Sequence, residues 1–314
     1  MRLAVAICTH RRPGPLGRLL DALAGLEPPL GEDGATPVAL DRALDVVVVD
    51  NDPAGEGRAV ALARRDYPFR LHAHLEREPG LSASRNRAVA EALALRPDLV
   101  AFIDDDEWPE PRWLAELVRV ARETGADAVG GPTRPAFPDG TPEAVRANPY
   151  YGADLDLPDG APCRLEAGGN FLATRRALET AGPVWFDPAW STSGGEDLAF
   201  FTALARGGAR MHWAAGAVVH EPVAPERLAP GWMRERVINV ANARVRVMQR
   251  LEPGPIASAV RVTKTAGLSA VALGLSGAGL ASAGLAERGR LLRWKALGKI
   301  GAHLGRAADR GPGS

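Results

Sequence analysis

The 314-residue chain has only two cysteines, no net charge and no segment that looks like a secretion signal. Cys8 and Cys163 are too few for a disulfide framework or a thiolate zinc site. Lys+Arg (38) balance Asp+Glu (38), so the basic excess typical of nucleic-acid-binding proteins is missing, and no nucleic-acid partner is expected. The apolar run after Met1 is short and is followed at once by basic residues, unlike a signal peptide. We therefore expect a cytoplasmic location.

Hydrophobic residues make up 46% of the chain, which excludes wholesale disorder. Short apolar runs of the kind found in buried strands occur at Leu3–Cys8, Leu44–Val49, Leu99–Ile103 and Ala126–Gly130. Segments with helical spacing lie between or after them, at Leu16–Leu26, Gly57–Arg65, Leu81–Leu95 and Arg112–Glu123. Ser82 or Ser84 is the expected N-cap of the third helix. This alternation predicts an α/β domain with a mostly parallel, Rossmann-like sheet flanked by helices.

Polar residues follow three of the predicted strands directly. They are Thr9 to Arg12, Asp50 to Asp52, and Asp104 to Glu107. Because ligands bind at the carboxyl ends of parallel strands, we expect these groups to converge on one crevice. Thr133–Arg164 has little periodicity and is expected to be a long loop passing over the site.

The run Asp104-Asp105-Asp106-Glu107 places four carboxylates at the end of a buried strand. Such groups repel one another and stay ionised together only beside a balancing charge. Oxygen ligands of this kind suit Mg²⁺ or Mn²⁺, with substrate phosphates completing the shell. The alternative is a solvated acidic turn that caps the next helix.

Two further segments contain candidate functional groups. In Gly194-Gly195-Glu196-Asp197, two acids open a helix after a glycine pair, and a carboxylate there can serve as a general base. An ordinary acidic helix start is the alternative. In Gly80–Arg87, Arg85 and Asn86 fall in a first helical turn, where arginine can reach a phosphate or an acid at a neighbouring strand end. A solvated helix start is again the alternative.

In this order, the segments resemble family 2 glycosyltransferases of the GT-A fold. The matching segments cover roughly residues 1–250 and are Ile7–Pro13, Val46–Asp52, Gly80–Arg87, Asp104–Pro109, Gly168–Phe171, Gly194–Asp197 and Val219–Glu221. The sequences FIDDDEWP, GGN and GGED particularly resemble transferases of bacterial exopolysaccharide assembly, of the succinoglycan type.

The resemblance implies an inverting, metal-dependent transfer of a sugar from a nucleotide-diphosphate sugar. A UDP-sugar is favoured, while GDP and dTDP stay open. The acceptor would be a glycan or a lipid-linked sugar in cell-surface polysaccharide synthesis. The divalent metal would be Mg²⁺ or Mn²⁺.

The resemblance also implies roles for single residues. Nucleotide-sugar contacts carry over to Thr9, His10, Arg12, Asp50, Asn51, Arg85, Asn86, Asp104 and Asp105. Asp106 matches the direct metal ligand of a DxD motif, with Asp104 and His220 beside it, although His220 could equally be a hydrogen-bonded strand-end histidine. Asp197 matches the catalytic base, with Glu196 next to it. Cys8 and His10 stand where the family often has Pro and Tyr, which puts base stacking on His10 in doubt.

Missing motifs weigh against other enzymes. A processive synthase would carry a QxxRW motif and several long apolar spans, and this chain has neither. A dinucleotide-dependent oxidoreductase would need G-x-G-x-x-G after the first strand, and a sugar-nucleotide pyrophosphorylase would have a Gly-rich loop there. The chain has Thr9-His10-Arg11-Arg12-Pro13-Gly14 at this place instead. The non-enzyme alternative is a membrane-associated scaffold on a transferase fold, against which the retained acidic motifs count.

The composition changes near residue 250, so we expect a glycosyltransferase domain at 1–250 and a helical appendage at 251–314. Thr265–Ala286 is uncharged but rich in small residues, and a basic amphipathic stripe follows it. Peripheral attachment to the cytoplasmic face of the inner membrane is favoured, at about 1 kcal/mol per basic residue near the lipid. A true membrane span and a soluble helical appendage are the alternatives.

Overall fold

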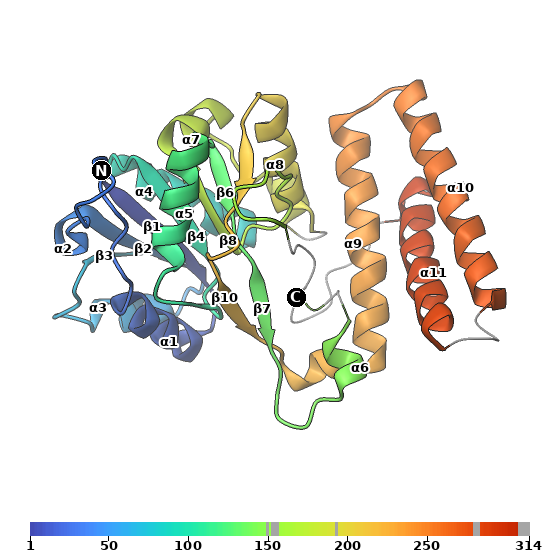
Figure 1. Ribbon diagram of the computed structural model, residues 1–314, viewed down its shortest axis with the longest axis horizontal. Helices are drawn as coiled ribbons and strands as arrows, with labels where there is room; N and C mark the ends of the chain where they lie inside the picture. The colour runs from blue at the N-terminus through green and yellow to red at the C-terminus, as the bar shows by residue number, and fades with distance from the viewer. Residues whose placement is uncertain (149–150, 152–156, 192–193, 279–282, 307–314) are drawn as a thin grey trace. The chain divides into compact units, whose positions relative to one another are not determined.

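The computed structural model describes residues 1–148, 151, 157–191, 194–278 and 283–306 (Figure 1). The chain forms two compact units. The first consists of Met1–Pro188 and Phe200–Val223, and the second of Ala189–Ala199 and Ala224–Ser314. The second unit thus includes a helix before residue 250, whereas composition placed a boundary at that residue. The functional division at 250 stays a prediction.

The first unit is built on a seven-stranded sheet in the order β3-β2-β1-β4-β8-β6-β9. Its strands are β1 (Leu3–Thr9), β2 (Leu44–Asp50), β3 (Arg70–Leu75), β4 (Leu99–Ile103), β6 (Ala128–Gly130), β8 (Asn170–Thr174) and β9 (Met211–Trp213). β8 runs antiparallel to both of its neighbours, β4 and β6, and the other pairings are parallel. A smaller sheet joins β5 (Trp108–Pro109), β10 (Val219–Pro222) and β7 (Thr133–Ala136).

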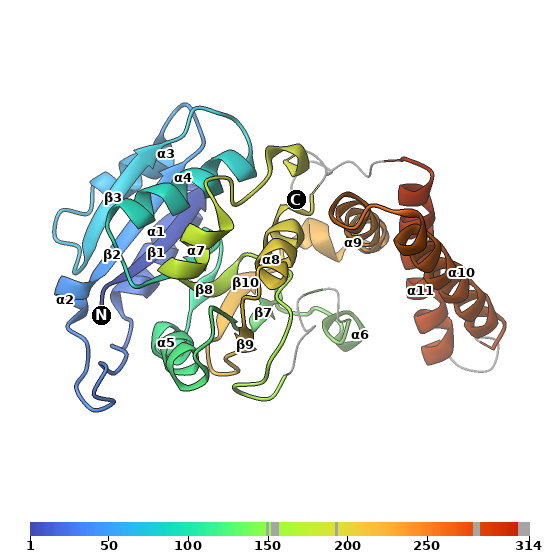
Figure 2. The ribbon, with the colours of Figure 1, turned by 90° about the horizontal axis from the view of Figure 1, so that it is seen from above.

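Helices cover both faces of the large sheet (Figures 1 and 2). One apolar core packs against α1 (Pro13–Ala24), α3 (Glu56–Leu62) and α5 (Trp113–Thr124). A second core packs against α4 (Leu81–Ala94), α7 (Arg175–Ala181) and α8 (Glu196–Arg206). Alternate strand residues supply the two cores: Val46 and Val48 face the first, and Val47 and Val49 the second. The shorter helices are α2 (Leu40–Ala43) and α6 (Glu143–Arg146), with single 3₁₀ turns at Pro188–Trp190 and Pro225–Leu228.

The predicted α/β fold with a mostly parallel sheet is confirmed, and all four predicted strands exist. β3 was not predicted because Arg70–Leu75 carries polar side chains and lies at the sheet edge. The segment Thr133–Arg164 was expected to be loop throughout, but it begins with β7 and contains α6. The serine N-cap of α4 was wrong. Gly80 is the N-cap, at φ 120°, and no side chain caps the helix.

The second unit contains three long helices, α9 (Pro230–Leu251), α10 (Pro255–Ala278) and α11 (Ala283–His303). α11 packs against both of the others. Gly298 lets α11 approach α9 closely, because a Cβ there would lie 2.2 Å from the Ile238 carbonyl oxygen. The buried Asn242 amide donates hydrogen bonds to the carbonyls of Gly298 (3.1 Å) and Arg306 (2.9 Å). The C-terminal part of the chain therefore forms a helical unit, as expected.

α10 has an unusual distribution of polarity. Its packed side carries Arg261 and Thr265, and the Thr265 hydroxyl lies 3.2 Å from the His303 ring nitrogen Nε2. Its outer side exposes large apolar residues, including Ile256 (80% exposed) and Leu273 (68%). Helices of water-soluble proteins show the opposite arrangement.

Within the described residues, Pro255–Ser276 is the one helical segment long and apolar enough to cross a membrane, with a mean hydropathy of 1.2. Length and composition alone give this result. Of the uncharged stretch Thr265–Ala286, residues 265–278 lie in α10 and residues 283–286 in α11. Ser282, a member of the small-residue stripe, lies outside the described residues.

Candidate active site

The carboxyl ends of β1, β2 and β4 meet at one edge of the large sheet. The hydroxyl of Thr9, the last residue of β1, donates a 2.6 Å hydrogen bond to the Asp105 carboxylate after β4. The Arg12 guanidinium lies 3.2 Å from Asp105 and 2.7 Å from Asp106. The backbone N–H of Asn51, after β2, donates to the Thr9 carbonyl at 2.9 Å. The three polar strand ends thus form one cluster of contacts.

Burial makes this acidic run electrostatically unfavourable. Asp105 is 5% exposed, and burial raises its pKa to about 6. Burial, followed by the charges of Asp104 and Glu221, raises the pKa of Glu107 well above the ordinary range. The Glu107 carboxylate accepts a hydrogen bond from the Asp104 backbone N–H at 3.2 Å. A bound cation would relieve this accumulation of negative charge.

Gly169 lets the backbone lie close against two of the acids. A Cβ at this position would lie 2.9 Å from Asp104 Oδ2 and 3.0 Å from Glu107 Oε1. Neither Gly169 nor Glu107 is among the site residues expected from the sequence, although Gly169 lies in the GGN motif and Glu107 in the acidic run. This close approach of the backbone to Asp104 and Glu107 therefore requires a residue without a side chain.

The residues fit a divalent metal in their chemistry, since several carboxylate oxygens crowd one strand end. Among the residues that the structure describes, no three His, Cys, Asp or Glu side chains are grouped as a formed metal site. Arg12 supplies the counter-charge to Asp105 and Asp106.

Asp50 and Asn51, expected to contact the nucleotide, also organise the loops of this edge. The Asp50 carboxylate accepts hydrogen bonds from the backbone N–H groups of Asp52 and Arg58, both at 2.9 Å. The Asn51 amide donates to two carbonyls in the loop after β3 and accepts from the Gly80 backbone N–H at 2.8 Å. Both side chains are buried. Asp50 therefore fixes the start of α3, and Asn51 the start of α4, relative to β2.

The adjacent residues Arg85 and Asn86 of α4 point to different surroundings. Arg85 is buried, with its guanidinium 3.4 Å from Asp104 and 5.4 Å from the centre of the Phe186 ring. Asn86 instead binds the chain after α7, accepting hydrogen bonds from the backbone N–H groups of Trp185 (3.1 Å) and Phe186 (2.9 Å). Its amide nitrogen donates to the Phe186 carbonyl at 2.8 Å. The structure thus brings Arg85, but not Asn86, to the acidic run.

The two predicted histidines have different surroundings. His10 is exposed at the end of β1. His220 Nε2 lies 3.1 Å from Glu110, and its ring stacks on Trp108 with the centroids 5.5 Å apart. These contacts match the alternative in which His220 is a hydrogen-bonded histidine at a strand end. Its role as a metal ligand stays a prediction.

The Gly194–Asp197 motif lies in the second unit and begins α8. Gly194 and Gly195 have positive φ values of 72° and 107°. A Cβ on Gly195 would lie 2.8 Å from Val247 of α9. Glu196 is 2% exposed, whereas Asp197 is partly exposed. The glycine pair thus lets the start of α8 pack directly on α9, with Asp197 partly accessible.

These features coincide with a known family. The chain belongs to glycosyl transferase family 2, whose sequence pattern matches residues 4–182, and it is a glycosyltransferase. It is 32% identical over 241 residues to the succinoglycan biosynthesis protein ExoM of Rhizobium meliloti (strain 1021), covering 75% of this chain and 72% of that protein. The predicted resemblance to succinoglycan-type transferases is thereby confirmed.

Solved structures share the fold at low sequence identity. The mannosyltransferase PcManGT from Pyrobaculum calidifontis, solved with GDP-Man and Mn²⁺, has a TM-score of 0.63 and 20% identity, covering 96% of this chain and 87% of that one. A fragment of S. aureus TarS, solved with UDP, has a TM-score of 0.53 and 15% identity, covering 98% and 92%. The match to a longer TarS chain covers 42% of that chain. These likenesses support the GT-A fold.

Proposed function

We propose that the protein transfers a hexosyl unit from a nucleotide-diphosphate sugar to a glycan or lipid-linked acceptor, with inversion at the anomeric carbon. The observation that carries this proposal is the contact of Thr9 and Arg12 with the acids that follow β4, within a family 2 domain. These contacts bring the ends of β1 and β4 together where a sheet of this kind binds its ligand.

A UDP-sugar is the favoured donor. TarS was solved with UDP and with UDP-GlcNAc, and PcManGT with GDP-Man. By the family correspondence, Thr9, His10 and Arg12 border the base. Asp50 bonds the pyrimidine ring, and Asn51 next to it also contacts the nucleotide sugar. Arg12 and Arg85 are cations next to the acidic run and can balance the charge of a diphosphate. Asp105 would bind the ribose.

Asp106 and Asp104 are the residues that would hold Mg²⁺ or Mn²⁺, as the Mn²⁺ complex of PcManGT also suggests. When bound, the cation offsets the negative charge that develops on the leaving diphosphate. Arg12 and Arg85 act on the same charge from the protein side.

Asp197 acts as the general base. The acceptor hydroxyl is a weak nucleophile, so a carboxylate within hydrogen-bond reach removes its proton as the new bond forms. A single base and in-line attack from the face opposite the leaving group invert the anomeric centre. Glu196 is buried at the same helix start and is the alternative catalytic residue.

We place the reaction in exopolysaccharide synthesis at the cytoplasmic face of the inner membrane. The relative named above is a succinoglycan biosynthesis protein. The exposed apolar side of α10 and the basic residues of α11 fit peripheral attachment to an anionic bilayer. Residues 251–306 carry eight Lys and Arg against two Glu.

A panel of nucleotide sugars, each with and without Mn²⁺, tests the donor by thermal shift, because a specific ligand raises the melting temperature. We expect a UDP-sugar with Mn²⁺ to give the largest shift. Transfer from that donor, with an α-linked sugar, should yield a β-linked product by NMR. An α-linked product would refute inversion, and donor binding without hydrolysis or transfer would favour the scaffold alternative.

A further inference from the structure

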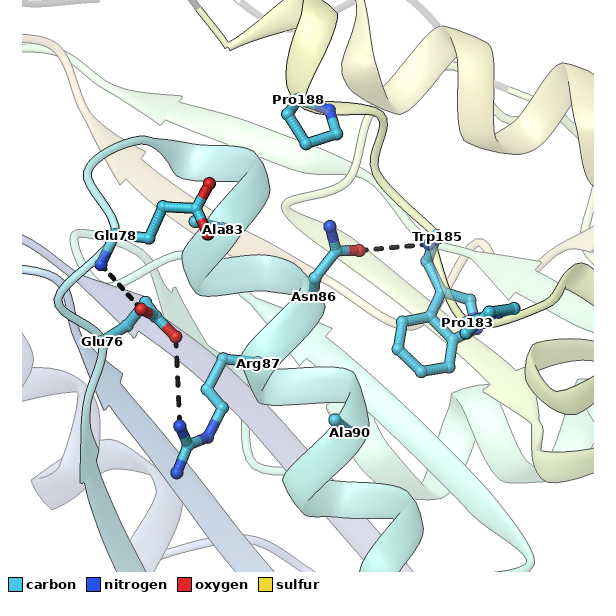
Figure 3. A pocket seen from close by; sticks show the side chains of 9 residues that line it. All are labelled: Glu76, Glu78, Ala83, Asn86, Arg87, Ala90, Pro183, Trp185 and Pro188. Atoms are coloured by element: carbon cyan, nitrogen blue, oxygen red, sulfur yellow. Dashed lines mark hydrogen bonds and ion pairs between the residues drawn. The ribbon is translucent and has the colours of Figure 1, made fainter.

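A cavity of about 400 Å³ lies on the outward side of α4, within the first unit (Figure 3). Three segments line it: the loop after β3, one side of α4 and the chain that follows α7. The lining residues are Glu76, Glu78, Ala83, Asn86, Arg87, Ala90, Pro183, Trp185 and Pro188. Its volume lies in the range of small-ligand sites, and nothing in the proposed chemistry uses it.

One end of the cavity is a fixed aromatic wall. The half-buried Trp185 indole donates a hydrogen bond of 2.7 Å to the Leu178 carbonyl, and its backbone N–H donates to Asn86. Figure 3 shows Pro183 next to the indole, with Asn86 between this wall and the acidic end. Because the indole is already positioned, a ligand stacks on it at little entropic cost. The C–H face of a pyranose ring is such a partner.

The other end is polar and rich in carboxylate oxygens. The Glu76 carboxylate accepts a hydrogen bond from the Glu78 backbone N–H at 2.7 Å. The Arg87 guanidinium lies 2.6 Å from Glu91 and 4.0 Å from Glu76. Glu78 is exposed, and its carboxylate makes no hydrogen bond or ion pair with the described residues. Carboxylates accept bonds from hydroxyl groups and repel anions. Because two carboxylates and one arginine that is already paired with acids line this end, it favours an uncharged polyol over a phosphate.

We propose that this cavity is a subsite for an uncharged hexopyranosyl unit of the acceptor glycan, stacked on Trp185 and hydrogen-bonded to Glu76 and Glu78. The inference rests on the proposed transferase function. α4 links the two sites, since Arg85 reaches the acidic run while Asn86, the next residue, lines the cavity. Acceptor recognition would thus include a sugar remote from the reacting hydroxyl.

The test uses the full chain labelled with 5-fluorotryptophan, and the Trp185 ¹⁹F resonance is assigned with Trp185→Phe. Neutral cello- and laminari-oligosaccharides serve as probes, and oligogalacturonates of equal length as anionic controls. We expect the neutral probes to shift the Trp185 resonance and the anionic ones to leave it unchanged. Ala90→Phe fills the cavity and Glu78→Gln removes a carboxylate charge, and we expect each to weaken binding about tenfold or more. Ala94→Phe, on the same helix outside the cavity, should bind normally.

Absence of a shift with every neutral probe, or equal binding by wild type and Ala90→Phe, would overturn the subsite. A thermal shift with UDP-sugar and Mn²⁺ on the same samples separates the two proposals. Retained donor binding without saccharide binding removes only the subsite, while loss of donor binding in the wild type removes the proposed function.

Discussion

Arg12 Nη1 lies 2.7 Å from an Asp106 carboxylate oxygen, in a contact between residues 94 positions apart in sequence. It joins the loop after β1 to the acidic run after β4. Arg12 is therefore the internal counter-ion of the residue expected to bind metal, and a cation must compete with it for the same oxygens. Nucleotide phosphates would give Arg12 another partner, which favours binding of metal and nucleotide together.

Replacement of Asp106 by Ala should lower transfer activity about 10²-fold or more, because the carboxylate oxygens for the cation are lost. Mn²⁺ titration calorimetry in the presence of UDP should show weakened metal binding by this variant. Asp21→Asn is the control, since it removes an exposed carboxylate that also lies against an arginine, 2.6 Å from Arg64. Full wild-type activity in excess EDTA would contradict the metal requirement.

Asp197→Asn should lower turnover about 10²- to 10⁴-fold while donor binding persists, because only proton removal is impaired. Initial rates measured alongside the UDP-sugar thermal shift separate these two effects. Glu196→Gln is the matched variant one residue earlier. If Glu196→Gln loses turnover and Asp197→Asn does not, the base is Glu196.

Gly195→Ala should destabilise the protein by about 1–3 kcal/mol more than Gly208→Ala does. Both glycines have positive φ, 107° and 83°, but only a Cβ at Gly195 meets another side chain, 2.8 Å from Val247. Urea unfolding measures the difference. Adding Val247→Ala to Gly195→Ala should recover part of it, and equal losses in the two glycine variants would show that Val247 does not limit the packing.

Asp45→Asn should destabilise the sheet edge at pH 7 by about 1–3 kcal/mol, leaving Arg70 without its carboxylate. Asp45 is 2% exposed and contacts Arg70 (2.7 Å) and His72 (2.8 Å). Burial acts to raise its pKa, but hydrogen bonds from Arg70 and His72 outweigh burial and lower the pKa below 3.8. The stabilisation that the Asp45 carboxylate gives the folded state is thus present above the unfolded-state pKa. It is lost as the pH falls through the lower folded-state pKa.

Urea unfolding of wild type and Asp45→Asn at pH 7 and near pH 3 checks that sign. The difference between the two proteins should shrink at the lower pH. The exposed Asp41, which lies 3.6 Å from Arg42, supplies the control variant Asp41→Asn, for which little change is expected. A difference that grows on acidification would be inconsistent with a lowered pKa of Asp45.

Leu273→Asp should reduce binding to phosphatidylglycerol-containing vesicles, because it puts a charge on the exposed apolar side of α10. Co-sedimentation, with release by high salt or alkaline carbonate, measures this and separates peripheral attachment from a span. Leu62→Asp, at a 55% exposed leucine of α3, is the control and should bind as wild type does. No binding by the wild type would favour a helical appendage without a membrane role.

The sequence predicted the strands with unbroken apolar runs because both of their faces are buried, as in Val46–Val49. It did not predict β3, whose polar residues lie at an edge, or the antiparallel placement of β8, which depends on pairing between distant segments. The meeting of the polar groups that follow β1, β2 and β4 could be predicted, because parallel strands end at the same edge of a sheet. The role of Asn86 in holding Trp185 and Phe186 could not be foreseen, because its partners lie about a hundred positions away.

The position of β8 has a consequence for how the protein is made. β6 has no sheet partner among the described strands other than β8 and β9, both of which come later in the chain. During synthesis, β1 to β4 can pair as soon as they emerge, but β6 must wait on the ribosome for residues 170–174. Until then Val129, which is fully buried in the folded protein, belongs to an unpaired strand. Synthesis of the intervening segment thus sets a delay during which the unpaired strand can be bound by chaperones or can aggregate.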